Sequence, residues 1–232
     1  MEIEDKWILK SDAVDWKKLE SQAEKTKKLE QGYLKDNIRN ALHVDGGNLV
    51  CAGIDIALDS SVSRALKDFI DGQGLTQGEA RYRKTSHAKG DTYVMTIKGK
   101  GTLGRYEAEF PISAEVAQHL QSPEICSGKV EKTRYMVPDN GGYLEIDRYH
   151  APRFSFASIE REFSDEAETA AYRLPDDWLK AGAVKATERS EFKNKNLAIH
   201  PAIAENAAQQ ILLHTSVATK HAPAAVKRDN GR

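Results

Sequence analysis

Charged residues alternate with apolar residues along several short stretches of this 232-residue chain. At the N-terminus, for example, Glu2 and Glu4 flank Ile3. Because successive side chains of a strand point to opposite faces, each stretch predicts a strand with one charged face and one apolar face. The basic positions of this pattern are Lys6, Arg81, Arg83, Lys98, Lys100, Arg105, Lys132 and Arg134. The acidic positions are Glu2, Glu4, Glu107, Glu109, Glu145, Asp147, Glu160 and Glu162.

A single strand of this kind usually turns its charged face to solvent. Here some strands carry only basic pairs and others only acidic pairs. Neighbouring like charges are costly unless a ligand or a counter-ion lies between them. A polyphosphate held by Lys and Arg, with Mg²⁺ or Mn²⁺ held by Asp and Glu, would satisfy both kinds of strand. The pattern therefore predicts an anion site beside a divalent-cation site on an inward-facing charged surface.

The elements that must carry these residues are strands first and helices second. Residues 1–9 predict one strand, and residues 79–163 predict short antiparallel strands separated by turn residues. Helices are predicted at residues 12–34, 62–70, 113–120, 165–173, 176–181 and 201–215. If the charged face points inward, helices must cover the apolar face. The expected fold is therefore α+β, with a closed antiparallel sheet surrounded by helices.

Composition narrows the class of protein. The chain has 34 Lys and Arg against 35 Asp and Glu, so it has no basic excess and a nucleic-acid partner is disfavoured. Its two cysteines, Cys51 and Cys126, are too few for a disulfide framework, and the N-terminus has no signal-peptide pattern. The longest apolar stretch, residues 48–58, is about half the length needed to cross a bilayer. We expect a cytoplasmic protein without a membrane partner, either a monomer or a homodimer.

The charged stretches also resemble, in order, the motifs of the CYTH superfamily, the triphosphate tunnel metalloenzymes. Residues 2–6 are similar to its N-terminal ExExK motif, and Gln31-Gly32-Tyr33-Leu34 is similar to its QGYL motif. The later matches are RxR at 81–83, TxK at 96–98, RxExE at 105–109, KxR at 132–134, ExD at 145–147 and ExE at 160–162. Each motif alone is common, but the ordered set covers most of residues 1–163.

The resemblance implies a closed eight-stranded antiparallel β-barrel that forms a tunnel and is surrounded by helices. It implies metal ligands at Glu2, Glu4, Glu145, Asp147, Glu160 and Glu162. It implies substrate-binding cations at Lys6, Arg81, Arg83, Lys98, Lys100, Arg105, Lys132 and Arg134. Glu2, Glu4 and Lys6 form the expected catalytic set, and Glu107 and Glu109 are expected to orient cations or a water.

The activity implied is a triphosphatase that depends on Mg²⁺ or Mn²⁺ and cleaves tripolyphosphate or a small organic triphosphate. One alternative is an adenylyl cyclase of the class IV type, which makes cyclic AMP and pyrophosphate from ATP. A second is a polyphosphate-binding or nucleotide-binding module without turnover. A triphosphate-containing small molecule is the expected partner in each case.

Two departures from the family pattern affect this prediction. The first is an insertion at about residues 35–79, interpreted as a surface decoration, a lid or an oligomer contact. The second is Lys185-Ala186-Thr187, which stands where bacterial triphosphatase-like members usually carry E-V-T. Nearby, residues 192–198 are similar to their Y-x-N-x-x-LA segment. We expect one domain over residues 1–215 and a tail at 216–232.

Overall fold

The computed structural model describes residues 3–100 and 106–218, so Glu2 and Arg105 lie outside the described residues. The long strands are β1 (Ile3–Lys10), β2 (Lys25–Leu34), β6 (Glu79–His87), β7 (Gly90–Lys98), β8 (Glu107–Pro111), β9 (Cys126–Asp139), β10 (Gly142–Ala151) and β11 (Phe156–Phe163). The short strands are β3 (His43–Asp45), β4 (Asn48–Cys51), β5 (Ile54–Ala57) and β12 (Val184–Lys185). The helices are α1 (Trp16–Gln22), α2 (Asp36–Asn40), α3 (Ser60–Gln73), α4 (Ala114–Leu120), α5 (Glu166–Ala171), α6 (Asp176–Lys180), α7 (Asn194–Ile199) and α8 (Pro201–Ala218).

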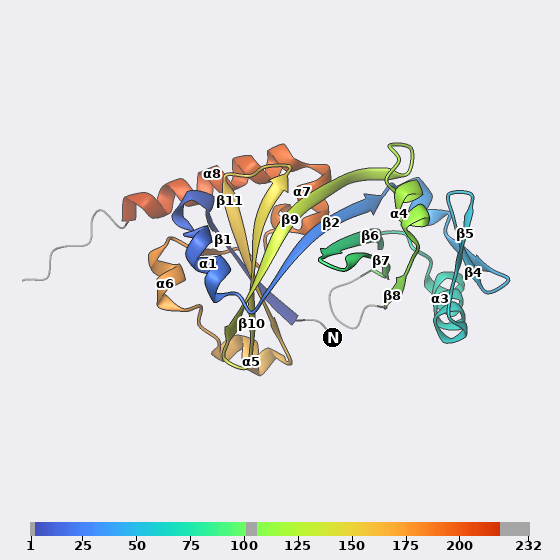
Figure 1. Cartoon of the computed structure of the whole chain (residues 1–232), viewed down its shortest axis with the longest axis horizontal. Coiled ribbons are helices and arrows are strands. Elements are labelled where there is room, and N and C mark those ends of the chain that lie inside the picture. Colours follow the sequence, from blue (N-terminus) through green and yellow to red (C-terminus); the bar gives the residue numbers. More distant parts are fainter. Residues whose placement is uncertain (1–2, 101–105, 219–232) are drawn as a thin grey trace, which may run out of the picture.

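One large antiparallel sheet organises the molecule. Its strand order is β12-β1-β11-β10-β9-β2-β6-β7-β8, and β3, β4 and β5 form a separate small sheet. Figure 1 shows the large sheet strongly curved, with β1, β11 and β10 on one side and β6, β7 and β8 on the other. The predicted α+β class, with a large antiparallel sheet and helices, is confirmed.

The closed eight-stranded barrel remains a prediction. Eight strands of the large sheet are at least five residues long, and β12 adds only a two-residue edge. Within the described residues β8 and β12 are the two edges, with no pairing between β8 and β1.

The helix predicted over residues 12–34 is wrong in its second half. Helix α1 ends at Gln22, and β2 then pairs with β6 and β9 along Lys25–Leu34. The Lys and Glu residues of this segment favour a helix locally. Pairing with two neighbouring strands overrides that weak preference because it satisfies the backbone on both sides. The other predicted helices are found as α3, α4, α5, α6 and α8.

Gly32 lies in β2 directly under the ring of Tyr82. A Cβ atom at Gly32 would lie 2.1 Å and 2.4 Å from two ring atoms of Tyr82 and 2.6 Å from its hydroxyl oxygen. Tyr82 is fully buried and donates to Glu30 at 3.0 Å. The ring therefore cannot move aside cheaply. We expect Gly32→Ala to lower the free energy of unfolding by about 1–3 kcal/mol. Urea denaturation will check this, with Gly72→Ala as the control for a glycine whose Cβ would meet no atom and whose φ is not positive.

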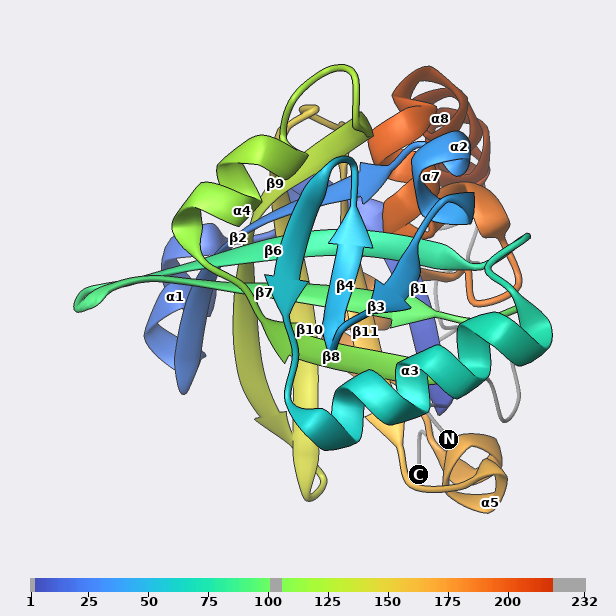
Figure 2. The same cartoon turned by 90° about the vertical axis from the view of Figure 1, so that its right-hand side faces the viewer.

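The apolar face of β6, β7 and β8 is covered by the insertion. Leu49, Ile56 and Leu66 of the insertion pack in one cluster with Tyr82 and Met95 of the sheet. Figure 2 shows α3 and the β3–β5 sheet in front of β6, β7 and β8. The insertion thus closes the part of the core where the sheet would otherwise expose apolar side chains.

The C-terminal helices cover the opposite, charged face of the sheet at one end. Ile8 of β1 shares a face with Lys6, and it packs with Phe156, Phe192 and Leu197. Phe192 and Leu197 bring η2 (Ser190–Phe192) and α7 against this face. The charged surface is therefore bounded at one end by a cluster of apolar side chains. Of the helices in residues 3–100 and 106–218, none has the length and apolar character to cross a membrane.

Candidate active site

The strand registers place the alternating charged residues on a single face of the sheet. Lys6 of β1 lies opposite Glu160 of β11, and Glu160 lies opposite Glu145 of β10. Each following strand continues the row through the pairs Asp147 and Arg134, Lys132 and Leu29, Gln31 and Arg83, Arg81 and Thr96, and Lys98 and Glu107. Residues far apart in the chain are thus brought together as the alternation predicts.

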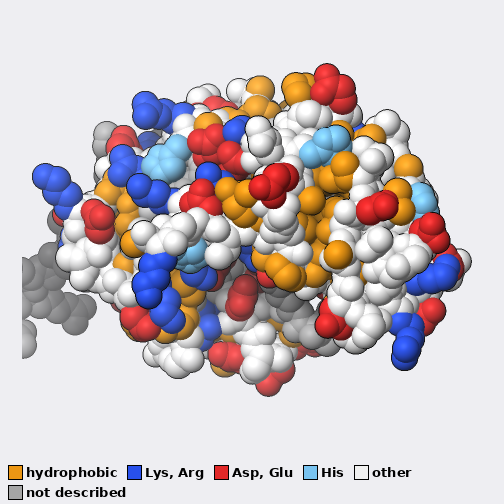
Figure 3. All heavy atoms as spheres, turned by 45° about the vertical axis from the view of Figure 1, so that its right-hand side comes forward, with side chains coloured by type: hydrophobic (Ala, Val, Ile, Leu, Met, Phe, Trp, Pro, Cys, Tyr) orange, Lys and Arg blue, Asp and Glu red, His pale blue; other side chains and the backbone are white. Residues whose placement is uncertain are grey.

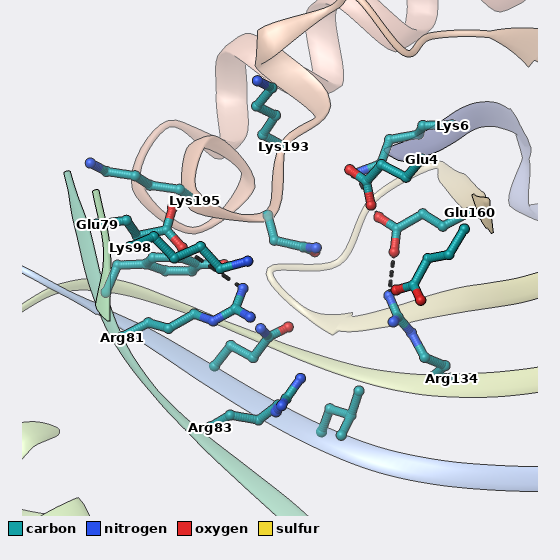
Figure 4. A pocket seen from close by; sticks show the side chains of 15 residues that line it. Glu4, Lys6, Glu79, Arg81, Arg83, Lys98, Arg134, Glu160, Lys193 and Lys195 are labelled. Carbon is teal, nitrogen blue, oxygen red and sulfur yellow. Dashed lines mark hydrogen bonds and ion pairs between the residues drawn. The ribbon is translucent and has the colours of Figure 1, made fainter. Parts of the chain in front are cut away.

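A cavity of about 190 Å³ lies over this face. Its lining residues are Glu4, Lys6, Leu29, Gln31, Tyr33, Glu79, Arg81, Arg83, Lys98, Arg134, Glu160, Glu162, Lys193, Asn194 and Lys195. Figure 4 shows Arg81, Arg83 and Lys98 on one side of the cavity and Glu4 and Glu160 on the other. The cavity therefore has a basic wall from β6 and β7 and an acidic wall from β1 and β11.

Arg134 is the centre of a buried ion-pair network in the floor of the acidic wall. Its guanidinium donates to Asp147 at 2.7 Å, to Glu160 at 2.5 Å and to Glu145. Lys6 pairs with Glu160 at 2.6 Å, and Lys132 pairs with Asp147 at 2.5 Å. Buried charges persist only when they are paired and hydrogen-bonded. This network, the Arg134 network, balances three cations against three carboxylates.

The network shifts the pKa values of its members. Burial alone would raise the pKa of Glu160, but Lys6, Arg134 and Lys132 hold that pKa well below its ordinary value. Burial alone would lower the pKa of Lys6, but Glu160 and Glu4 raise it above its ordinary value. Burial and the adjacent Arg134 lower the pKa of Lys132. Glu160 and Lys6 are therefore both charged at neutral pH.

The basic wall contains donors that the protein itself does not use. The Nε atom of Arg81 and the hydroxyl of Tyr33 are buried and have no hydrogen-bond partner of good geometry in the described part of the chain, although the two side chains lie close enough to interact with each other. The carboxylate of Glu79 lies at 3.8 Å from Nη1 of Arg81. Arg83 pairs instead with the half-exposed Glu109 at 2.8 Å. Unpaired buried donors that face a cavity are suited to an anionic ligand, which would complete their hydrogen bonds.

The start of α7 and the residue before it bring further cavity residues that the charge alternation did not predict. Lys193, Asn194 and Lys195 line the cavity. The Asn194 side chain accepts from Lys132 Nζ at 3.0 Å, and the Phe192 carbonyl accepts from Lys6 Nζ at 3.0 Å. Their similarity to the Y-x-N-x-x-LA segment was the signal available in the sequence. It identified the segment but not its place over the cavity.

Several predicted residues take other positions. Lys132, Glu145 and Asp147 belong to the Arg134 network and are not among the described residues that line the cavity. Lys100 is exposed and is likewise absent from that lining. Lys98 lines the cavity and pairs with Glu107 at 2.9 Å, and Glu109 accepts from Thr96 at 3.1 Å.

The carboxylates of the acidic wall meet some, but not all, of the requirements of a divalent-cation site. Glu4 and Glu162 lie directly opposite each other in the β1–β11 register and both line the cavity, so two carboxylates are available on one side of it. Carboxylate oxygens are the ligands that Mg²⁺ and Mn²⁺ prefer. Nevertheless, no group of three or more metal-binding side chains is found within residues 3–100 and 106–218. Glu2, the other predicted ligand of the N-terminal motif, is outside this set.

The contacts of Lys185 explain why this chain differs from the E-V-T pattern at that position. Lys185 pairs with the buried Asp5 at 2.8 Å, and the Thr187 hydroxyl donates to the same carboxylate at 2.9 Å. Thr187 also accepts from the backbone N–H of Lys6 at 3.0 Å. A Lys at position 185 thus complements the Asp at position 5, and it holds the C-terminal segment against β1.

We expect Lys185→Glu to lower the free energy of unfolding by about 1–3 kcal/mol, because it places a like charge beside the buried Asp5. Thermal denaturation at neutral pH will measure the loss. Lys180→Glu changes the net charge by the same amount at an exposed position and is the matched control. Equal losses in the two variants would show that the Asp5 contact contributes nothing.

Comparison with known proteins gives one curated relative. This is the inorganic triphosphatase of Nitrosomonas europaea, 34% identical over 113 residues, which are 48% of this chain and 71% of the relative. No family model matches the chain.

Solved structures with a related arrangement include the hypothetical protein NE1496 and the inorganic triphosphatase NE1496. They share 25% and 23% identity with this chain, each with a TM-score of 0.47, and cover 86% of it and 98% and 95% of their own chains. The PH1819 protein from Pyrococcus horikoshii OT3 shares 17% identity with a TM-score of 0.45, over 79% of this chain and 92% of its own.

Proposed function

Because this chain belongs to the family of the inorganic triphosphatase from Nitrosomonas europaea, the CYTH-type triphosphatases, we propose that it hydrolyses a phosphoanhydride bond of inorganic tripolyphosphate in the charged cavity. Water attacks the terminal phosphorus, the P–O–P bond breaks, and orthophosphate and pyrophosphate leave. The observation that carries the proposal is the basic wall with unpaired buried donors facing an acidic wall.

The cavity favours an inorganic chain over a nucleotide. Its described lining is charged or amide-bearing except for Leu29 and Tyr33, so it offers little surface on which a base could stack. A volume of about 190 Å³ lies below the usual range of sites for drug-sized ligands. On the face shown in Figure 3, acidic and basic side chains are interspersed, which does not favour nucleic acid as a partner.

The charge of the cavity also supports a divalent cation. Seven of the described lining residues are Lys or Arg and four are Glu, a difference of three positive charges. A triphosphate carries about four negative charges near neutral pH. We propose that Glu4 and Glu162, together with Glu2, hold Mg²⁺ or Mn²⁺. When bound, such an ion offsets the remaining charge and polarises phosphoryl oxygens and water.

The chain's own residues would then act by binding and orientation. Arg81, Arg83 and Lys98 hold the phosphates through charge-assisted hydrogen bonds and stabilise charge that spreads over the phosphoryl oxygens. Lys6 extends from the acidic wall, where Glu160 keeps it protonated. We also propose that the large sheet closes as an eight-stranded tunnel and that the enzyme works in the cytoplasm.

Phosphorus NMR tests the proposal directly. Purified protein is incubated with Mg²⁺ or Mn²⁺ and, in parallel, with tripolyphosphate, ATP and thiamine triphosphate. Orthophosphate and pyrophosphate from tripolyphosphate are the expected products, and both EDTA and Glu4→Gln should abolish them. Cyclic AMP with pyrophosphate from ATP would instead establish a cyclase, and tight binding without product in any sample would establish a binding module.

A further inference from the structure

The insertion meets the cavity wall beside Lys98. Gly99 follows β7 and Tyr106 precedes β8, and the Gly99 N–H donates to the Tyr106 carbonyl at 2.8 Å. The next residues along the two strands are Lys98 and Glu107, which pair with each other at the cavity edge. The Gly99–Tyr106 hydrogen bond therefore sets the spacing of the strands where Lys98 enters the site.

Phe69 of α3 packs on both ends of this hydrogen bond. Its ring stacks on the Tyr106 ring, with centroids 4.2 Å apart and an angle of 10° between the planes. A Cβ atom at Gly99 would lie 2.8 Å and 3.0 Å from two Phe69 ring atoms, so the backbone of Gly99 runs directly against the ring. Phe69 is only 7% exposed, which leaves it little freedom to move.

A second contact of the insertion reaches the backbone of Lys98 itself. A Cβ atom at Gly78, at the end of the insertion, would lie 2.6 Å from the Lys98 carbonyl oxygen. The insertion thus contacts Lys98 and both residues next to the Lys98–Glu107 pair. Of the described residues at positions 35–79, Glu79 alone lines the cavity, and it is the first residue of β6. The body of the insertion, from β3 to α3, therefore lies outside the described lining.

We propose that the insertion is a positioning device for the basic wall, in which the Phe69–Tyr106 stack holds the ends of β7 and β8 so that Lys98 points into the cavity. The inference rests on the proposed function to the extent that Lys98 binds phosphate. The physical reason is that a Lys side chain is long and flexible, so the aim of its ammonium depends on a rigid backbone. A small displacement of a binding group costs a large factor in affinity.

A double-mutant cycle in steady-state kinetics tests this role. Phe69→Ala is expected to raise KM for tripolyphosphate about tenfold, with a smaller change in kcat. Lys98→Ala should raise KM by at least as much. Because Phe69 acts through Lys98, the double variant should resemble Lys98→Ala alone. If the increase in KM of the double variant equals the product of the increases in the two single variants, the proposal is overturned.

Two matched variants separate positioning from general destabilisation. Leu66→Ala removes apolar volume from the same helix, where the side chain is fully buried in the same cluster. Its KM should stay near the wild-type value. Tyr106→Ala should behave as Phe69→Ala does, and Tyr106→Phe, which keeps the ring, should restore the wild-type KM. A rise in KM for Leu66→Ala equal to that for Phe69→Ala would contradict the role given to the stack.

A readout independent of turnover distinguishes failure of this inference from failure of the proposed function. Amide hydrogen exchange, followed by NMR on the full-length protein, should be faster at Gly99 in Phe69→Ala and unchanged at Gly99 in Leu66→Ala. This result would support positioning of the strand ends even if tripolyphosphate is not the substrate. Unchanged exchange at Gly99 in Phe69→Ala would overturn the inference whatever the substrate is.

Discussion

Arg134→Leu is expected to lower the free energy of unfolding by about 3–5 kcal/mol. The substitution removes one cation from the Arg134 network and leaves Glu145, Asp147 and Glu160 with only two cationic partners, Lys6 and Lys132. The side chain of Asp147 is fully buried and that of Glu160 is 6% exposed, so water cannot replace the lost hydrogen bonds. Urea denaturation at neutral pH measures the loss.

Two further variants test this reasoning. Arg83→Leu removes the same type of residue from a single pair with Glu109 whose side chains are 27% and 42% exposed, so it should cost less than about 1 kcal/mol. Arg134→Leu combined with Glu145→Gln restores the balance of two cations and two carboxylates and should recover part of the loss. If Arg83→Leu proves as destabilising as Arg134→Leu, burial of the network is not the cause.

The same network makes a prediction about acid. The pKa of Glu160 is lower in the folded protein than its ordinary value, so its contribution to stability is present above the unfolded pKa and is lost as the pH falls toward the folded pKa. Without Arg134 the pKa of Glu160 should be less depressed. The acid unfolding midpoint of Arg134→Leu should therefore lie at a higher pH than that of the wild type.

The charged face could be predicted from the sequence because the strand period is fixed. Arg81 and Arg83 are two residues apart in one strand, so their side chains share a face. The register between strands then determines which residues of the neighbouring strands lie beside them. The alternation does not tell which charged residues neutralise one another. Arg134 and Lys98 were predicted as equivalent phosphate ligands, yet Arg134 contacts three carboxylates of the buried network, whereas Lys98 pairs with Glu107 at the edge of the cavity.

The features that sequence reasoning missed depend on contacts between distant segments. Residues 25–34 have helix-favouring composition, and only pairing with β6 and β9 makes them a strand. Lys193 and Asn194 reach the cavity because η2 and α7 pack on the apolar end of the charged face. No local pattern specifies that packing. The place of the insertion on the outer face likewise follows from its apolar surface meeting that of β6–β8.

Arg81→Ala is expected to lower kcat/KM for tripolyphosphate by about 10²–10³-fold while leaving the fold as stable as the wild type. Arg81 differs from Arg134 because the protein uses few of its donors: Nε has no described partner, and Glu79 lies 3.8 Å away. The ion pair of Arg81 with Glu79 is longer than the contacts of Arg134 with three carboxylates, so removing Arg81 should cost far less folding free energy than removing Arg134. Removing Arg81 from a site where it meets a phosphoryl group costs transition-state stabilisation.

Steady-state kinetics and urea denaturation of the same preparation measure the two effects of Arg81→Ala together. Arg81→Lys should recover only part of the activity, since an ammonium cannot donate two parallel hydrogen bonds as a guanidinium does. Lys100→Ala, at an exposed position outside the described cavity lining, should change neither quantity. If Arg81→Ala unfolds the protein as Arg134→Leu does, Arg81 serves the fold. In that case, a hydrogen-bond donor without a protein partner that faces the cavity would not be evidence that its residue binds substrate.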